Sequence, residues 1–205
     1  NTPGTWTLTG SERMKNRPIS ILVDALKALG AKIEYLEKQG CPPMKIEGGN
    51  LTGGKISIDG SVSSQYLSAL IMIAPTLSGG LEMELTGKIA SIPYLKMTLA
   101  LLGEFGVKYA FEGNTIKIEE GKYQGKEFIV EADWSAASYW YQIAALADEA
   151  KITLKGLKEV SLQGDSAIVE MYELFGIKST FKGTEVTLEK VLPPKLEAFN
   201  YDFSD

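Results

Sequence analysis

The chain repeats one pattern three times, and this repetition constrains the fold more than any other feature. In each copy an amphipathic helical segment ends at a glycine, which is followed by a small or β-branched residue, a lysine and a strand-like alternation. The three segments are Asp24–Leu36 (DALKALGAKIEYL), Thr98–Phe111 (TLALLGEFGVKYAF) and Val169–Phe181 (VEMYELFGIKSTF). Gly30, Gly106 and Gly176 stand where a helix ends in the left-handed conformation. After each glycine we expect a β-hairpin.

A second kind of helix is predicted between these segments. Residues 64–77 and 135–147 are apolar on nearly every face, which is typical of a buried helix. A strand is expected before each, including Phe128–Glu131 before the second, and another strand after each. The unit is therefore βαβαββ, with one copy over residues 55–120 and another over 126–190. Residues 1–48 hold the second half of a third copy.

These copies predict an α/β (α+β) fold in which βαβαββ units surround buried helices, with the sheets outside. The missing first half of the first copy indicates that the architecture is truncated. The polar, glycine-rich stretch Glu120–Lys126 (EGKYQGK) is the expected boundary between two structural bodies.

Composition excludes several classes of function. A net charge of −5 over 205 residues predicts no general affinity for nucleic acid or an anionic membrane. The apolar segments of about 12 residues are too short to span a bilayer. With one cysteine, Cys41, and no histidine, the chain has no intrachain disulfide, histidine-based triad or histidine metal site. One thiol fits a reducing compartment, and we expect a cytoplasmic protein without a metal.

The stretch Asp59–Leu67 (DGSVSSQYL) carries the strongest chemical signal. It links a strand to a buried helix, and it places Ser61, Ser63 and Ser64 where the helix begins. The first turn of a helix has N–H groups without internal partners, and hydroxyls beside them suit a phosphate or carboxylate. One serine would serve as a cap, whereas three serines followed by Gln65 exceed that need. We therefore interpret this turn as an anion site.

A basic turn precedes an earlier helix. Gly10–Pro18 carries Arg13, Lys15 and Arg17, and Pro18 is expected to be the first helical residue. Three cations at a helix N-terminus oppose the helix dipole, and an anionic ligand would offset that cost. A solvated basic loop is an equally good interpretation of these residues.

A third turn, Lys88–Tyr94 (KIASIPY), lies at the equivalent place after the next strand. Ser91 is the natural N-cap there, and Tyr94 lines either a site or the core. Asp133 is expected to cap the second buried helix. Because all three turns belong to one end of the architecture, we expect Arg17, Ser63, Ser64 and Ser91 to converge on anionic substrates.

At these residues the chain resembles the EPSP synthase family, the 3-phosphoshikimate 1-carboxyvinyltransferases. The matching strings are LTGSERMKNRPI, LVDALKALGAKIEYL, DGSVSSQYLSAL, SIPYLKMTL and ADWSAASYW, and the resemblance runs over the whole chain. It implies an inside-out α/β barrel of two domains, each made of three βαβαββ units. Residues 1–122 would then be part of the N-terminal domain and 123–205 part of the C-terminal domain.

The resemblance also implies a reaction and its binding residues. The enolpyruvyl group of phosphoenolpyruvate would be transferred to the 5-hydroxyl of shikimate 3-phosphate, without a cofactor. Ser63, Ser64 and Ser91 would hold the phosphate of shikimate 3-phosphate, and Tyr94 would line its site. Arg17 would bind phosphoenolpyruvate, and Gln65 would contact both ligands.

The chain departs from the family pattern by what it lacks. The family's N-terminal Lys and Arg strand has no counterpart, and the tail Asp202–Asp205 resembles the lead-in to the catalytic Asp. We therefore expect a central fragment that is inactive by itself and able to self-associate, whereas the intact enzyme would be a monomer. A UDP-N-acetylglucosamine enolpyruvyl transferase is a rival, although Cys41, followed by two prolines, is in the wrong setting. A non-catalytic α/β binding module is the rival from another class.

Overall fold

The computed structural model describes residues 1–49, 51–61, 63–89 and 91–191, so the tail Asp202–Asp205 lies outside the described residues. The chain forms two compact units, one of Asn1–Lys126 and one that begins at Glu127. Each unit is described by itself below. The assignment of residues 1–122 and 123–205 to the two domains of the family stays a prediction.

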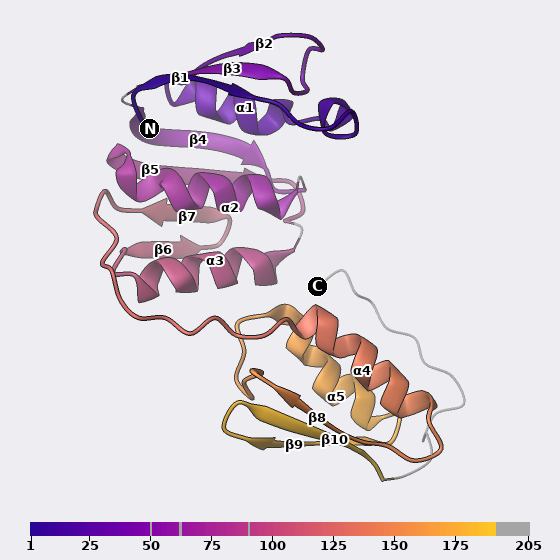
Figure 1. The fold of residues 1–205 in the computed structure, drawn as a ribbon. Coiled ribbons are helices and arrows are strands. Elements are labelled where there is room, and N and C mark those ends of the chain that lie inside the picture. The colour runs from indigo at the N-terminus through magenta and orange to yellow at the C-terminus, as the bar shows by residue number, and fades with distance from the viewer. Residues whose placement is uncertain (50, 62, 90, 192–205) are drawn as a thin grey trace. The chain divides into compact units, whose positions relative to one another are not determined.

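The centre of the first unit is one complete βαβαββ copy, as the sequence predicts (Figure 1). Its strands form a sheet of order β4-β5-β7-β6, in which β4 and β5 are parallel and the other pairs are antiparallel. The elements are β4 (Thr52–Asp59), α2 (Ser64–Ile73), the 3-10 helix η2 (Ala74–Thr76), β5 (Ser78–Thr86), α3 (Ile92–Glu104), β6 (Tyr109–Glu112) and β7 (Thr115–Ile118).

The half copy before it has the order that the repeat predicts. Its elements are β1 (Gly4–Leu8), the 3-10 helix η1 (Met14–Asn16), α1 (Ser20–Ala28), β2 (Lys32–Tyr35) and β3 (Met44–Gly48). The sheet order β1-β3-β2 matches β5-β7-β6, and every pair in it is antiparallel.

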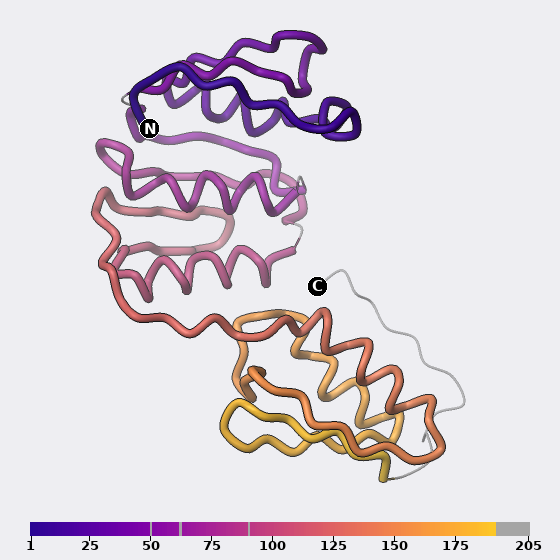
Figure 2. The backbone as a smooth tube through the Cα atoms, viewed as in Figure 1, coloured from indigo at the N-terminus to yellow at the C-terminus, as the bar shows by residue number. Residues whose placement is uncertain are grey.

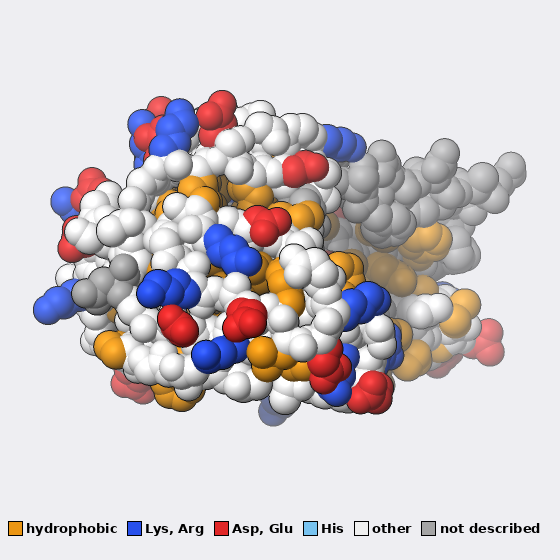
Figure 3. All heavy atoms as spheres, turned by 90° about the horizontal axis from the view of Figure 1, so that it is seen from above, with side chains coloured by type: hydrophobic (Ala, Val, Ile, Leu, Met, Phe, Trp, Pro, Cys, Tyr) orange, Lys and Arg blue, Asp and Glu red, His pale blue; other side chains and the backbone are white. Residues whose placement is uncertain are grey.

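On the face that Figure 3 shows, positive and negative side chains are interspersed.

The predicted helix start at Pro18 is wrong by two residues. Helix α1 begins at Ser20, because Arg17 is extended (φ −86°, ψ 122°) and Ile19 has φ −136°. A residue that precedes proline is pushed out of the helical region, and here the Ile19 N–H donates to Gly40 O instead (2.8 Å).

The core of the first unit is centred on α2, which contacts α1 on one side and α3 on the other. Leu67, Leu70 and Ile71 of α2 are completely buried, and Leu95 and Leu99 of α3 pack into the same cluster. Each such side chain contributes about 1.5–3 kcal/mol through removal from water. This packing fixes the ends of α2 and α3 relative to each other.

The second unit repeats the pattern with one element missing. It contains α4 (Trp134–Leu146), β8 (Lys151–Lys155), the 3-10 helix η3 (Gly164–Ala167), α5 (Ile168–Glu173), β9 (Ile177–Lys182) and β10 (Glu185–Lys190). Its antiparallel sheet has the order β8-β10-β9. Trp134 and Tyr141 of α4 are completely buried against this sheet. The expected cap is confirmed, since Asp133 accepts a hydrogen bond from the Ser135 N–H (2.8 Å).

The strand predicted at Phe128–Glu131 is not formed. Residues 121–133 contain no helix or strand, and Ile129 and Val130 are 78% and 81% exposed. A strand needs a partner for its backbone groups. Directly after Glu131, the Ala132 N–H donates a hydrogen bond to Gly156 O (2.8 Å), which joins this stretch to the residue that follows β8.

Residues 120–126, which the sequence predicts to be the boundary, are bound to the first unit (Figure 2). The Gly121 N–H donates to Pro75 O (2.9 Å), and the Gln124 N–H donates to Phe105 O (2.8 Å). The Tyr123 hydroxyl donates to Met72 O (2.6 Å). Residues 120–126 therefore form a strap along the first unit.

The three repeat glycines end their helices as predicted. Gly30, Gly106 and Gly176 have φ values of 95°, 81° and 80°, a conformation that only glycine adopts at low cost. Among the described residues, no helix is long and apolar enough to cross a membrane.

Candidate anion-binding site

The turns that follow β4 and β5 pack against each other. Because these strands are parallel, both turns leave the sheet at the same edge. The Gly60 N–H donates to Thr86 O (2.7 Å), and a Cβ added at Gly60 would lie 3.1 Å from the Ile89 side chain. Glycine at position 60 therefore permits a close approach between the turn before Ser63 and the turn before Ser91.

Helix α2 begins within the predicted serine cluster. Ser63 occupies the N-cap position, yet within the described part of the chain its hydroxyl makes no capping bond. Ser63 and Gln65 are exposed, and Ser64 is half-buried. Asp59 accepts a hydrogen bond from the Ser61 N–H (2.9 Å), which holds the pKa of this carboxyl below its ordinary value. The first turn of α2 thus presents serine hydroxyls beside helix N–H groups.

Helix α3 begins at Ser91 in an unusual conformation. Ser91 has φ 56° and ψ 46°, and it is the one residue other than glycine with a positive φ among those the structure describes. It occupies the predicted N-cap position, but it makes no side-chain capping bond in the described region. Strained backbone of this kind costs about 1–3 kcal/mol and clusters at functional sites. Tyr94, in the first turn of α3, is 49% exposed.

A chain of hydroxyls joins α2 to α3 just behind these two helix ends. The Thr98 hydroxyl donates to Tyr94 O (2.9 Å), so the Ser68 hydroxyl is the donor in its 2.9 Å contact with Thr98. This link fixes the backbone of Tyr94 relative to α2. Sequence reasoning missed Ser68 and Thr98, although a serine within an otherwise apolar helix was a signal.

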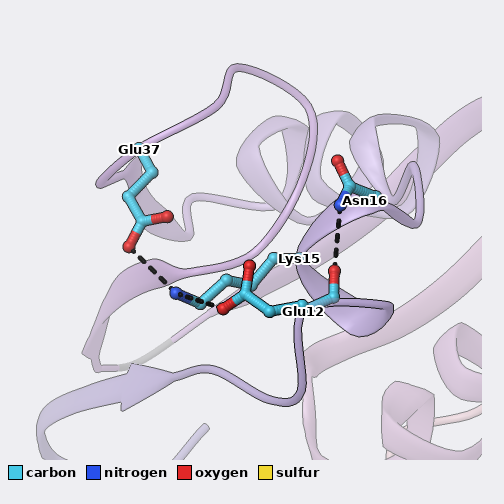
Figure 4. Close-up of polar contacts among 4 residues, drawn as sticks. All are labelled: Glu12, Lys15, Asn16 and Glu37. Carbon is cyan, nitrogen blue, oxygen red and sulfur yellow. Dashed lines mark hydrogen bonds and ion pairs between the residues drawn. The ribbon is translucent and has the colours of Figure 1, made fainter.

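The cations of the basic turn Gly10–Pro18 have different surroundings. Lys15 contacts Glu12 and Glu37, each at 3.4 Å, and these hydrogen bonds, with Glu37 first, raise the pKa of Lys15 (Figure 4). Asn16 donates to Glu12 O (2.9 Å) and closes the turn. Lys15 thus anchors the turn to the loop after β2, while Arg17 is exposed.

The basic turn is also joined to α2. The Tyr66 hydroxyl donates to Pro18 O at 2.5 Å, which brings the backbone next to Arg17 against the first turn of α2. The N-terminal ends of α1, α2 and α3 lie at the same end of the first unit (Figure 1). The structure thus brings together the elements that carry Arg17, Ser63, Ser64, Gln65, Ser91 and Tyr94.

The prediction for Cys41 can also be compared with the structure. Cys41 is 4% exposed, and its burial agrees with the expectation of an inert thiol. Among the described residues, no group of His, Cys, Asp and Glu could hold a metal ion. The candidate site combines the hydroxyls of Ser63, Ser64 and Ser91 with the Gln65 amide and the exposed guanidinium group of Arg17.

The repeated βαβαββ architecture, with polar turns at one end of its helices, is that of the enolpyruvyl transferases. The chain resembles an EPSP synthase from Acinetobacter baumannii with a TM-score of 0.68 and 22% identity, over 91% of this chain and 42% of that one. It also resembles the enolpyruvyl transferase NikO from Streptomyces tendae, with a TM-score of 0.58 and 17% identity, over 90% and 43% of the two chains.

Sequence comparison identifies the particular family. The model of the EPSP synthase (3-phosphoshikimate 1-carboxyvinyltransferase) family matches residues 1–203, and the chain belongs to this family. It is 49% identical over 191 residues to the 3-phosphoshikimate 1-carboxyvinyltransferase of Bacteroides fragilis and 42% identical over 204 residues to that of Sulfurovum sp.. These alignments cover 93% and 98% of the chain, which spans 47% of the length of each relative.

Proposed function

We propose that the chain is part of an enzyme that transfers the enolpyruvyl group of phosphoenolpyruvate to the 5-hydroxyl of shikimate 3-phosphate. This step of chorismate and aromatic amino acid biosynthesis would take place in the cytoplasm. Family membership supports the reaction. The observation that supports the proposal is the contact at Gly60, because it packs the turn before Ser63 against the turn before Ser91.

Each candidate residue has a role that its chemistry supports. Ser63, Ser64 and Ser91 would hold the phosphate of shikimate 3-phosphate beside the first turns of α2 and α3. Tyr94 would form a wall of this site. Arg17 would pair with phosphoenolpyruvate, because a guanidinium group presents a planar fork to a carboxylate or phosphate. Gln65 would contact both substrates.

The reaction needs two polyanions to meet in a defined orientation. A proton adds to the methylene carbon of phosphoenolpyruvate, and the 5-hydroxyl oxygen forms a bond to the neighbouring carbon while losing its own proton. That carbon then expels phosphate, and loss of a methyl proton restores the double bond. The residues of this chain would neutralise and orient the substrates. The groups that move the protons are proposed to come from outside this chain, so the chain alone should not turn over.

Calorimetry with shikimate 3-phosphate tests this assignment directly. We expect the chain to bind this ligand weakly and to lose about tenfold or more in affinity in the Ser63→Ala/Ser64→Ala variant, which removes two charge-assisted hydrogen bonds. Ser78→Ala is the matched control, because Ser78 is exposed at the start of β5 and far along the strand from the turn. Equal affinity in all three proteins would place the ligand elsewhere, and phosphate release with both substrates would contradict the assignment of proton transfer.

The rival UDP-N-acetylglucosamine enolpyruvyl transferase receives no support from Cys41. A thiol that reacts with substrate must reach it as an accessible thiolate. Cys41 is buried and lies directly before Pro42 and Pro43. The burial of this thiol therefore favours the shikimate 3-phosphate assignment.

A further inference from the structure

Tyr66 makes a contact that joins two parts of the candidate site. Its side chain comes from the first turn of α2, directly after Ser63, Ser64 and Gln65. Its hydroxyl donates to the carbonyl oxygen of Pro18, 48 residues away in the sequence, at 2.5 Å. The acceptor belongs to the residue that follows Arg17, so this hydrogen bond acts on the backbone that carries the guanidinium group.

Two backbone hydrogen bonds hold the segment around Arg17 to elements other than α2. The Arg17 N–H donates to Met14 O within its own turn (3.0 Å), and the Ile19 N–H donates to Gly40 O before β3 (2.8 Å). Both bonds fix the segment to its own half copy. The Tyr66 bond is different, because it fixes the segment to the helix that carries the serines.

Helix α2 is a rigid support for such a contact. Leu67 and Leu70, in the turn that contains Tyr66 and the next, are completely buried. A tyrosine has only two side-chain torsions, so its hydroxyl is held at a defined distance from the helix at a small entropic cost. The distance from the Arg17 backbone to Ser63 and Ser64 is therefore set partly by one phenolic hydroxyl.

We propose that Tyr66 is a positioning residue, which holds Arg17 at the correct distance from the serine cluster without touching either substrate. The proposal rests on the proposed function, in which Arg17 binds phosphoenolpyruvate and the serines bind shikimate 3-phosphate. A phenylalanine at this position fills the same space but leaves Pro18 O without its partner. Displacement of a binding group by about 1 Å is enough to reduce catalysis substantially.

The test compares Tyr66→Phe with Tyr123→Phe in the full-length protein that contains this chain. Tyr123 is a matched control, because its hydroxyl also donates to a backbone carbonyl, Met72 O at 2.6 Å, but in the strap of residues 120–126. We expect Tyr66→Phe to raise the KM for phosphoenolpyruvate about fivefold to tenfold, the effect of one lost hydrogen bond. The KM for shikimate 3-phosphate should stay within about twofold, and Tyr123→Phe should leave both constants unchanged.

A double-mutant cycle separates positioning from general stabilisation. If Tyr66 acts through Arg17, Tyr66→Phe should have little further effect on phosphoenolpyruvate binding once Arg17→Ala is present. Additive effects, an equal rise in both KM values, or a wild-type KM for phosphoenolpyruvate in Tyr66→Phe would each overturn the proposal. A wild-type protein that neither binds nor converts shikimate 3-phosphate would instead overturn the proposed function.

Discussion

At the scale of single residues, Ser91 is the clearest case in which stability and binding are opposed. Its left-handed backbone would be relaxed by glycine, which adopts positive φ at no steric cost. The serine therefore pays a conformational penalty at the position where the proposed site needs a hydroxyl. This pattern is expected where a binding function, rather than folding, selects the residue.

Replacement Ser91→Gly should separate the two effects. We expect the free energy of unfolding to stay the same or rise by about 1 kcal/mol, since the relief of strain exceeds the added entropy of the unfolded chain. Affinity for shikimate 3-phosphate should fall, because the hydroxyl is lost. Chemical denaturation and calorimetry measure the two quantities. A clear loss of stability would show that the Ser91 side chain supports the fold.

Glu131 illustrates a residue whose charge organises a loop in the second unit. Its carboxylate accepts hydrogen bonds from the Lys158 N–H (2.8 Å), the Ser161 hydroxyl (2.7 Å) and the Trp134 indole (2.9 Å). Burial raises the pKa of this carboxyl, but the hydrogen bonds outweigh burial and hold the pKa below its ordinary value. The ionised form is therefore the one that stabilises the folded state.

The pH dependence follows from the sign of this shift. A carboxyl with a lowered folded-state pKa stabilises the protein above its unfolded-state pKa of about 4.3, and that stabilisation is lost as the pH falls through the folded-state pKa. Glu131→Gln should cost about 1–2 kcal/mol at pH 7 and flatten the decline in melting temperature below pH 4.5. Glu159→Gln, in the same loop but exposed, is the control. Parallel pH profiles for all three proteins would contradict this role.

At the scale of elements, α2 and α4 are equivalent helices with different surroundings. Helix α4 begins 70 residues after the start of α2, so Leu70 of α2 corresponds to Trp140 of α4. Leu70 is completely buried in a cluster to which residues of α1 and α3 also belong, whereas Trp140 is 48% exposed. Tyr139, Ile143 and Leu146 extend the same exposed stripe, with exposed fractions of 68%, 51% and 78%.

This stripe predicts that the chain self-associates. Contiguous apolar side chains on a surface favour association when no partner covers them. The double variant Trp140→Gln/Ile143→Gln should sediment as a monomer at concentrations where the original chain forms larger species. Met72→Gln is the matched control, since Met72 is 52% exposed on α2. A chain that is monomeric at all concentrations before substitution would disprove the prediction.

At the scale of the whole molecule, the sequence predicts the features that depend on residues close together in the chain. Helix-terminating glycines such as Gly106 and apolar periodicity define the βαβαββ unit, because they act within a few residues. The contact of Tyr66 with Pro18 and the pairing of Lys15 with Glu37 were not predicted, because they depend on how distant segments pack. The strand at residues 128–131 was wrongly predicted, because propensity cannot supply a pairing partner.

The stretch that was expected to be a strand is a site at which proteases should cut the chain. Proteases cut preferentially at exposed segments outside helices and strands, and Ile129 and Val130 are exposed within such a segment. The strap before it is shielded by its bonds to Pro75, Met72 and Phe105. Limited thermolysin digestion should therefore cut first at residues 128–130, as mass spectrometry would show, and Ile129→Asp/Val130→Asp should slow that cut. The first cuts falling within 120–126 would contradict this expectation. A nick in this stretch would fall outside every helix and strand of the described residues, so it would leave the sheets of both units uncut.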